Sequence, residues 1–229
     1  MGTQNYGVSL STIVLHHLEL SRSTRVLWAL EELALPYEIK TYKRDKNMRA
    51  DPALKQIHPL GKSPVVVIDD LVLAESGAIL EHLVEMGGGA LQPQSQQERQ
   101  NVRYWLHFAE GTLIPTLLMS LIHNKSIEKV PFFLKPILKS ILSTIDGVYT
   151  NPEILGNMAF VEQTLADRTW LAGENFTAAD IQMSFGLQGG VQWASATHDY
   201  PNICSYIQRF EARPAYKRAV EIGGSPMPD

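Results

Sequence analysis

The sequence of 229 residues holds one cysteine, Cys204, which excludes an intramolecular disulfide and a zinc site built from several cysteines. A lone cysteine fits a reducing compartment, so we expect a cytoplasmic protein. No apolar run approaches the roughly 18 residues of a membrane-spanning helix, and residues 1–10 do not resemble a signal peptide. The 20 basic and 24 acidic residues leave a net charge of −4, which predicts no bulk attraction to nucleic acid or anionic lipid.

Several enzyme motifs are also missing from the sequence. The seven histidines have no metal-ligand spacing, so we expect no metal. The sequence contains no GxSxG, Walker A or GxGxxG motif, which argues against a serine hydrolase, a P-loop nucleotide enzyme and a Rossmann dehydrogenase. The 45% of hydrophobic residues is enough to form a core, which excludes a disordered chain.

The first third of the chain alternates between short β-rich runs and helical patterns. Pro36 ends the first helical pattern, and Asp69-Asp70 lies between two strand patterns as a hairpin turn. The patterns predict strands at 12–16, 37–42, 64–68 and 71–74, and helices or turns at 22–35, 50–57 and 77–86. This β-α-β-α-β-β-α order predicts a thioredoxin-like domain over residues 10–87.

The rest of the chain reads as helical. A linker rich in Gly, Pro and Gln follows at residues 87–97, and no convincing strand pattern comes after it. Helical patterns cover 98–123, 130–149, 152–165, 178–194, 201–212 and 214–222. Residues 97–222 are therefore predicted to form an all-α domain, and the fold class is α/β plus all-α.

Three short segments of the first domain could carry chemistry. Ser21, ahead of the first helix, is a candidate N-cap, and its hydroxyl could also donate to a bound thiolate in positive potential. Ser63-Pro64 begins a strand; a cis bond there would free the backbone of Ser63 to pair with an extended ligand. Ser76 is a second candidate N-cap, and with Glu75 it could hold the carboxylate and ammonium of an amino acid.

Together these segments resemble a cytosolic glutathione S-transferase, and the resemblance covers residues 10–215. It rests on the order and spacing of Ser21, His58-Pro-Leu-Gly-Lys-Ser-Pro64, Glu75-Ser76 and the capping box within Asn175-Phe-Thr-Ala-Ala-Asp180. The opening segment, Leu15 to Leu33 and then Tyr37 to Arg44, is most similar to the fungal, yeast-type, and bacterial branch with a serine-type active-site loop.

The resemblance implies how glutathione is held. Ser63 and the cis-proline Pro64 would bind its cysteinyl part, and Glu75 and Ser76 its γ-glutamyl end. The glycine carboxylate would face Lys62, with Arg49 and Lys46 as further candidates.

The resemblance also places the thiol-activating residue in the loop after the first strand. Ser21 occupies the serine position, Arg22 and Ser23 are competitors, and related branches use an Asn at the position of Arg22. The loop contains no cysteine, which argues against glutaredoxin-like chemistry. A cleft near Tyr104, His107 and Phe108 would take the electrophile, unless these side chains are interdomain core.

The implied function is conjugation of glutathione to small hydrophobic electrophiles for detoxification, with reduction of organic hydroperoxides as a further activity. Two alternatives stay open: a glutathione-dependent disulfide reductase or isomerase, and a non-catalytic glutathione-binding regulatory protein. The family implies a homodimer. Residues 127–152 could wall the electrophile site, extend the dimer contact or touch a membrane, and relatives at the endoplasmic reticulum make that location an alternative to the cytoplasm.

Overall fold

The computed structural model describes residues 11–194 and 198–227, so the segment examined for a signal peptide lies outside the described residues. Its N-terminal part contains a four-stranded sheet in the order β2-β1-β3-β4. The strands are β1 (Ile13–Leu18), β2 (Tyr37–Tyr42), β3 (Val65–Ile68) and β4 (Leu71–Ala74). β1 is parallel to β2 and antiparallel to β3, and β3 and β4 form the predicted hairpin.

Two helices and a short 3₁₀ turn complete this domain. α1 (Ser23–Glu32) follows β1, the 3₁₀ turn covers Pro52–Gln56, and α2 (Ser76–Met86) follows β4. α1 buries a continuous stretch of its length, including Val26, Leu27 and Trp28. The order of elements confirms the predicted thioredoxin-like arrangement.

The helical part departs from the sequence prediction in its first three helices. α3 (Gln96–Phe108) continues through a π turn, Ala109–Leu113, into α4 (Ile114–Lys129). In the same way, α5 (Lys135–Ile145) continues through a second π turn, Asp146–Thr150, into α6 (Asn151–Ala166). The predicted break before Pro152 was therefore wrong. Proline lacks the N–H of a regular turn, and the widened π turn directly before it accommodates that loss without ending the helix.

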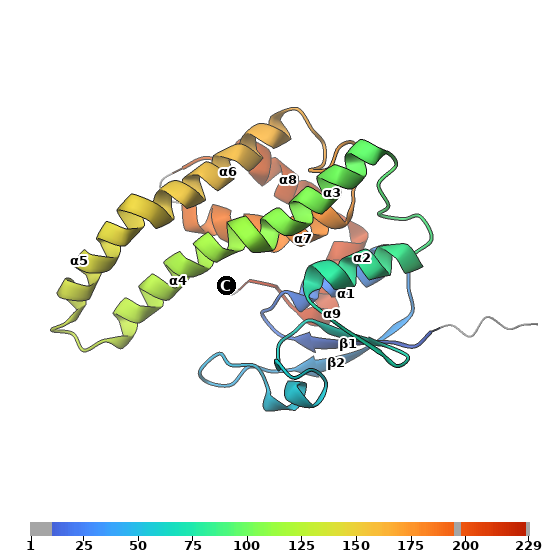
Figure 1. Cartoon of the computed structure of the whole chain (residues 1–229), viewed down its shortest axis with the longest axis horizontal. Coiled ribbons are helices and arrows are strands. Elements are labelled where there is room, and N and C mark those ends of the chain that lie inside the picture. Colours follow the sequence, from blue (N-terminus) through green and yellow to red (C-terminus); the bar gives the residue numbers. More distant parts are fainter. Residues whose placement is uncertain (1–10, 195–197, 228–229) are drawn as a thin grey trace, which may run out of the picture.

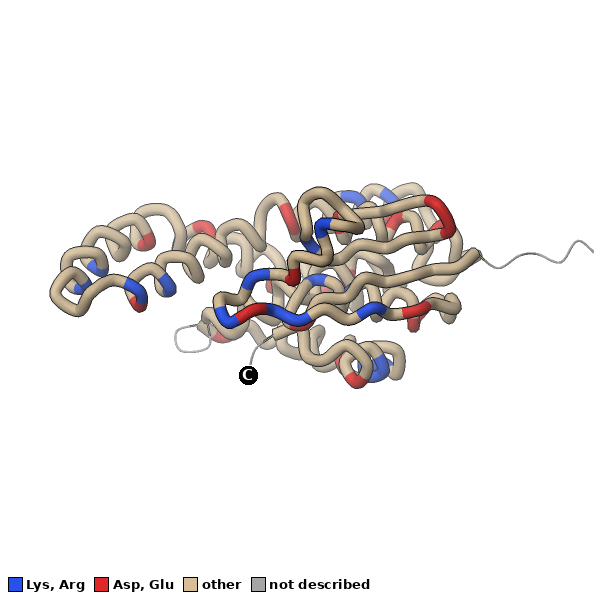
Figure 2. The backbone as a smooth tube through the Cα atoms, turned by 90° about the horizontal axis from the view of Figure 1, so that it is seen from below, with Lys and Arg blue, Asp and Glu red and all other residues tan. Residues whose placement is uncertain are grey.

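These two long helices form a hairpin that projects from the rest of the molecule (Figures 1 and 2). Its tip is very exposed: the side chains of Phe132 and Phe133 are 83% and 63% accessible. Among the described helices, Gln96–Lys129 is long and apolar enough to cross a membrane by length and composition, although 39% of its apolar window is buried in the protein.

The remaining helices tie the two halves together. α7 (Ala178–Ala194) runs through the centre and packs against α1, α2, α3 and α4; it is followed by α8 (Pro201–Glu211) and α9 (Pro214–Gly223). α9 returns to pack on α1, where Arg213 and Arg218 pair with Glu32 and Glu31 (Figure 1). Helix α9 therefore helps to hold the β1–α1 segment in place.

The predicted capping box at the start of α7 is present in altered form. Asp180 accepts the N–H of Thr177 at 2.8 Å, as a capping box requires. The Thr177 hydroxyl donates to the same carboxylate instead of capping α7, and Leu171 N–H and Tyr206 O–H donate to it as well. Burial raises the pKa of Asp180 to about 6, against these four hydrogen bonds, which lower it.

Candidate functional site

The predicted binding segments meet at one end of the sheet. His16 of β1 is opposite Val65 of β3, and Val65 is opposite Ala74 of β4, so these residues form the last shared row of the ladders. Directly beyond it lie the loop after β1, the residues before β3 and the residues after β4. The loop after β2, which carries Lys46 and Arg49, leaves from the same end because Tyr42 pairs with Leu18.

Ser63 has the geometry of a backbone-binding residue. The Ser63–Pro64 peptide bond is cis, as predicted, and the Ser63 hydroxyl donates to the carbonyl of His16 at 3.0 Å. Within the described part of the chain, neither the N–H nor the C=O of Ser63 has a hydrogen-bond partner. Both groups are therefore free to pair with an extended ligand, and the neighbouring Lys62 is exposed.

Glu75 and Ser76 form a strained turn into α2. Glu75 has a φ of +71° and occupies the N-cap position, so the prediction of Ser76 as N-cap was wrong. A side chain other than glycine in this region costs of order 1–3 kcal/mol, and such strain is typical of binding sites. Ser76 is the first helical residue, and its oxygen accepts a hydrogen bond from Gln182 at 3.1 Å, which leaves its own hydrogen free to donate to an anion.

The loop after β1 holds its two serines in the interior. Arg22, not Ser21, occupies the N-cap position of α1, although the Ser21 oxygen accepts the N–H of Ser23 at 3.2 Å. The Ser21 hydroxyl also lies 2.7 Å from the carbonyl of Leu18 and 2.8 Å from the Ser23 oxygen. Ser21 is 6% accessible and Ser23 is fully buried, so Ser21 is nearer the surface of the two.

A partly buried charge cluster behind this loop was missed by the sequence analysis. Arg25, 2% accessible, donates to Glu110 at 2.8 Å and to the carbonyl of Gln182 at 2.6 Å. Arg22 Nε lies 3.1 Å from the other Glu110 oxygen, and both guanidinium groups lie over the ring of Phe185. Burial lowers the pKa of Arg25 to about 10, so it is still charged at neutral pH. An arginine among apolar residues of α1 was the available signal.

The predicted electrophile residues lie on α3. Tyr104, His107 and Phe108 line a concavity of about 640 Å³, together with Gly111 and Thr112. Tyr104 is 50% accessible, whereas Phe108 is 8% accessible. The rings of Tyr104 and Phe108 pack in a cluster that also contains Trp105 and Phe160. Phe108 thus contributes to the core of the helical part as well as to the concavity.

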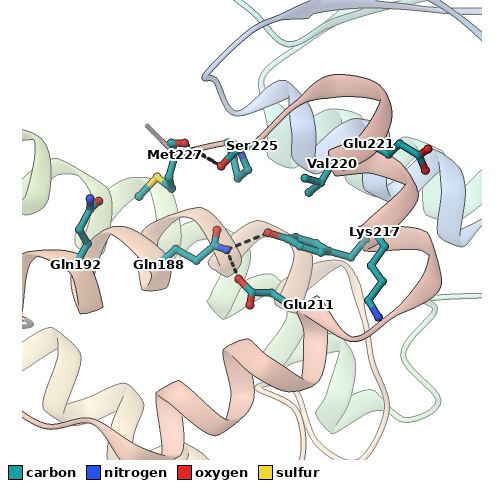
Figure 3. Close-up of a pocket in the computed structure, with 10 residues that line it drawn as sticks. Gln188, Gln192, Glu211, Lys217, Val220, Glu221, Ser225 and Met227 are labelled. Carbon is teal, nitrogen blue, oxygen red and sulfur yellow. Dashed lines mark hydrogen bonds between the residues drawn. The ribbon is translucent and has the colours of Figure 1, made fainter. Parts of the chain in front are cut away.

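A second concavity, also of about 640 Å³, lies between α7, α9 and the C-terminal tail (Figure 3). Gln188 donates to the carboxylate of Glu211 at 2.8 Å and to the hydroxyl of Tyr216 at 2.9 Å. Ser225 and Met227 of the tail close one side. No sequence motif pointed to this region, because it is formed by helices distant in the chain.

Two further features of the described residues concern metal ligands and the single cysteine. Within residues 11–194 and 198–227, no group of three or more His, Cys, Asp or Glu side chains could hold a metal ion. Burial, together with Asp199 and Glu162, raises the pKa of the Cys204 thiol, which disfavours the reactive thiolate form.

The fold is that of a two-domain protein of the thioredoxin-like class, with a cis-proline at one end of the sheet and a helical second part. Family models for the N-terminal and C-terminal domains of glutathione S-transferase match residues 10–85 and 148–214. Glutathione S-transferase 3 of Schizosaccharomyces pombe is 40% identical over 211 residues, covering 91% of this chain and 87% of that protein. Glutathione S-transferase 1 of Saccharomyces cerevisiae is 33% identical over 225 residues, covering 93% and 96%.

Solved structures agree with this assignment. A crystal structure of a glutathione S-transferase from Actinobacillus pleuropneumoniae has a TM-score of 0.74 and 34% identity, and covers 92% of each chain. A glutathione transferase family member from Pseudomonas fluorescens, solved with two glutathione bound, shares the fold with a TM-score of 0.72 at 24% identity, over 94% of this chain and 95% of that one. The chain belongs to the glutathione S-transferase family, as a transferase that uses glutathione as co-substrate.

Proposed function

We propose that this chain holds glutathione across the end of the sheet and conjugates its thiol to small hydrophobic electrophiles. The observation that carries the proposal is the convergence of the free Ser63 backbone, the Glu75–Ser76 turn and the Ser21 loop at one sheet end. Ser63 pairs with the cysteinyl unit, Glu75 and Ser76 take the γ-glutamyl ammonium and carboxylate, and Lys62 faces the glycine carboxylate. Residues 10–87 bind glutathione and residues 97–222 supply the electrophile site.

To activate the thiol, the β1–α1 loop must stabilise the thiolate form of bound glutathione. A free thiol has a pKa of about 8.5, and lowering it by about two units requires roughly 2.7 kcal/mol of preference for the thiolate. One hydrogen bond to the charged thiolate and the N-terminus of α1 together supply stabilisation of this order. Ser21 is the residue we assign to the thiol, because it is closer to the surface than Ser23.

The test is a pH titration of bound glutathione that follows the ultraviolet absorbance of the thiolate. We expect saturable binding, a thiol pKa well below the free value, and conjugation of a chlorodinitrobenzene. Binding without a lowered pKa, or no binding at millimolar glutathione, would contradict the proposal. Cumene hydroperoxide in the same assay tests the peroxidase activity, and turnover of hydroxyethyl disulfide without conjugation would favour the reductase alternative.

We also infer a homodimer in the cytoplasm. Large apolar side chains of α4 and α5 are exposed on the projecting hairpin, which is typical of a surface that another molecule covers: Leu118, Leu121, Ile122, Ile137 and Ile141. Sedimentation of the purified protein should give the mass of two chains. A monomer that cosediments with vesicles would instead assign residues 127–152 to a membrane surface.

A further inference from the structure

A buried chain of hydrogen bonds connects Ser21 to the C-terminal helix. The oxygens of Ser21 and Ser23 are 2.8 Å apart, and the Ser23 oxygen lies 2.8 Å from Nδ1 of His17. Nε2 of His17 lies 2.8 Å from the carbonyl oxygen of Gly223, the last residue of α9. His17 and Ser23 are both fully buried. Side chains that are far from solvent and joined in this way form one network.

The Gly223 carbonyl sets the direction of this network. A carbonyl only accepts hydrogen bonds, so Nε2 of His17 must carry a hydrogen. Burial lowers the pKa of His17, against the Gly223 carbonyl and Glu19, which raise it, so the ring is neutral at neutral pH. Nδ1 is then an acceptor, and the Ser23 hydroxyl donates to it at 2.8 Å, a shorter contact than the 3.1 Å to the Leu18 carbonyl.

The Ser21 oxygen is left as a hydrogen-bond acceptor for a ligand. With its hydrogen directed at His17, the Ser23 oxygen accepts from Leu18 N–H at 3.1 Å and can also accept from the Ser21 hydroxyl. The Ser21 hydrogen therefore has two internal acceptors, the Ser23 oxygen and the Leu18 carbonyl. The Ser21 oxygen receives the Ser23 N–H and has a second lone pair left, which suits the S–H of a bound thiol.

We propose that His17 is the acceptor of the glutathione proton, which reaches it through Ser21 and Ser23; this inference rests on the proposed function. The S–H bond breaks and the proton joins the Ser21 oxygen, the Ser21 hydrogen moves to Ser23, and the Ser23 hydrogen moves to Nδ1 of His17. The products are a thiolate and an imidazolium, and both serines end as neutral hydroxyls. When the conjugate leaves, the proton returns along the same path to solvent.

Two neighbours of His17 oppose the burial that lowers its pKa, and they favour the cation once the thiolate exists. α1 contributes the Ser23 hydroxyl, α9 contributes the Gly223 carbonyl, and the loop after β1 contributes Glu19, the charged side chain that acts on the ring. The carbonyl and the carboxylate both stabilise an imidazolium. Gly223 itself fits closely, since a Cβ there would lie 2.9 Å from Cε1 of His17, so the ring has little room to turn away from its partners.

The first experiment compares the thiol pKa of bound glutathione in the full chain and three variants. Ser23→Ala breaks the path, and His17→Gln keeps an amide donor and acceptor but cannot take a proton. His16→Gln is the matched control, because His16 is also buried on β1 but bonds Tyr42. We expect Ser23→Ala and His17→Gln each to raise the thiol pKa by about one unit, a tenfold fall in the ratio of thiolate to thiol. Glutathione affinity should change little, and His16→Gln should match the wild type.

The second experiment needs no variant, so it does not depend on variants that fold. Nuclear magnetic resonance of the imidazole nitrogens should show His17 becoming protonated when glutathione binds at neutral pH. S-methylglutathione, which has no thiol hydrogen, should leave His17 neutral.

The results distinguish a failure of the proton relay from a failure of the proposed function. A lowered thiol pKa in the wild type that survives both substitutions, or a His17 that stays neutral with glutathione, overturns the relay alone. An unshifted thiol pKa in the wild type overturns the proposed function.

Discussion

Nη2 of Arg25, in the first helix, lies 2.8 Å from Oε1 of Glu110, in the π turn between α3 and α4. This ion pair joins the thioredoxin-like part to the helical part directly behind the β1–α1 loop. Gln182 adds a second connection, since its carbonyl accepts from Arg25 and its amide donates to Ser76. The same few side chains therefore hold the domain interface and orient one residue of the proposed glutathione site.

Substitution of Glu110→Gln should lower the free energy of unfolding by about 2 kcal/mol, because the buried Arg25 charge loses a counter-ion that is itself partly exposed to solvent. Chemical denaturation at neutral pH measures the loss. Glu128→Gln is the control, since Glu128 pairs with Lys125 at 2.9 Å on an exposed surface, where such a pair contributes less than about 1 kcal/mol. Equal losses in both variants would contradict a stabilising role for the Arg25–Glu110 ion pair.

Substitution of Glu75→Gln should weaken glutathione binding about tenfold, because the exposed carboxylate is the proposed partner of the γ-glutamyl ammonium. Isothermal titration calorimetry gives the dissociation constant. Glu81→Gln, on the exposed face of the same helix, removes the same charge away from the sheet end and should leave binding unchanged. A similar loss in both variants would indicate a general effect of charge.

The sequence predicted the order of strands and helices along the first domain because its signals are local. Pro36 ends a helix, Asp69-Asp70 turns a hairpin, and the cis bond before Pro64 lies where the resemblance placed it. The continuous helices around Pro152 were not predictable from these rules, since a π turn leaves no simple pattern in sequence.

Contacts between distant segments could not be predicted from the sequence, for a different reason. His17 bonds Gly223, and Arg25 bonds Glu110, across separations that only the fold brings together. A histidine and an arginine on buried faces signal that partners exist, but they do not identify them.

Replacement of Tyr206→Phe should destabilise the protein more at pH 7.5 than at pH 4.5. The pKa of Asp180 is about 6 in the folded protein, and about 4 is usual for an unfolded chain, so only the folded state keeps the proton between these values. Raising the pH through that window therefore lowers the free energy of unfolding. Tyr206 offsets part of this loss, because its hydroxyl lies 2.9 Å from the carboxylate and favours the charged form.

The size of that effect follows from the charge of the acceptor. The hydrogen bond should contribute about 2 kcal/mol when Asp180 is ionised and about 1 kcal/mol when it is neutral. Denaturant titrations at both pH values measure the difference. A loss that is equal at pH 4.5 and pH 7.5 would mean that Asp180 does not titrate between them in the folded state.

Polar substitution of both phenylalanines at the hairpin tip should leave the stability of the protein nearly unchanged. Phe132 and Phe133 are 83% and 63% accessible, so Phe132→Ser with Phe133→Ser removes little buried surface and should cost less than about 0.5 kcal/mol. Phe108→Ala is the matched control, since its ring is 8% accessible in the aromatic cluster and its loss should cost about 3 kcal/mol or more. Thermal unfolding is measured at two protein concentrations. If the unfolding temperature of the double variant falls, and the fall becomes smaller at the higher concentration, the tip is covered in the dimer. A fall that does not depend on concentration would contradict the exposed hairpin.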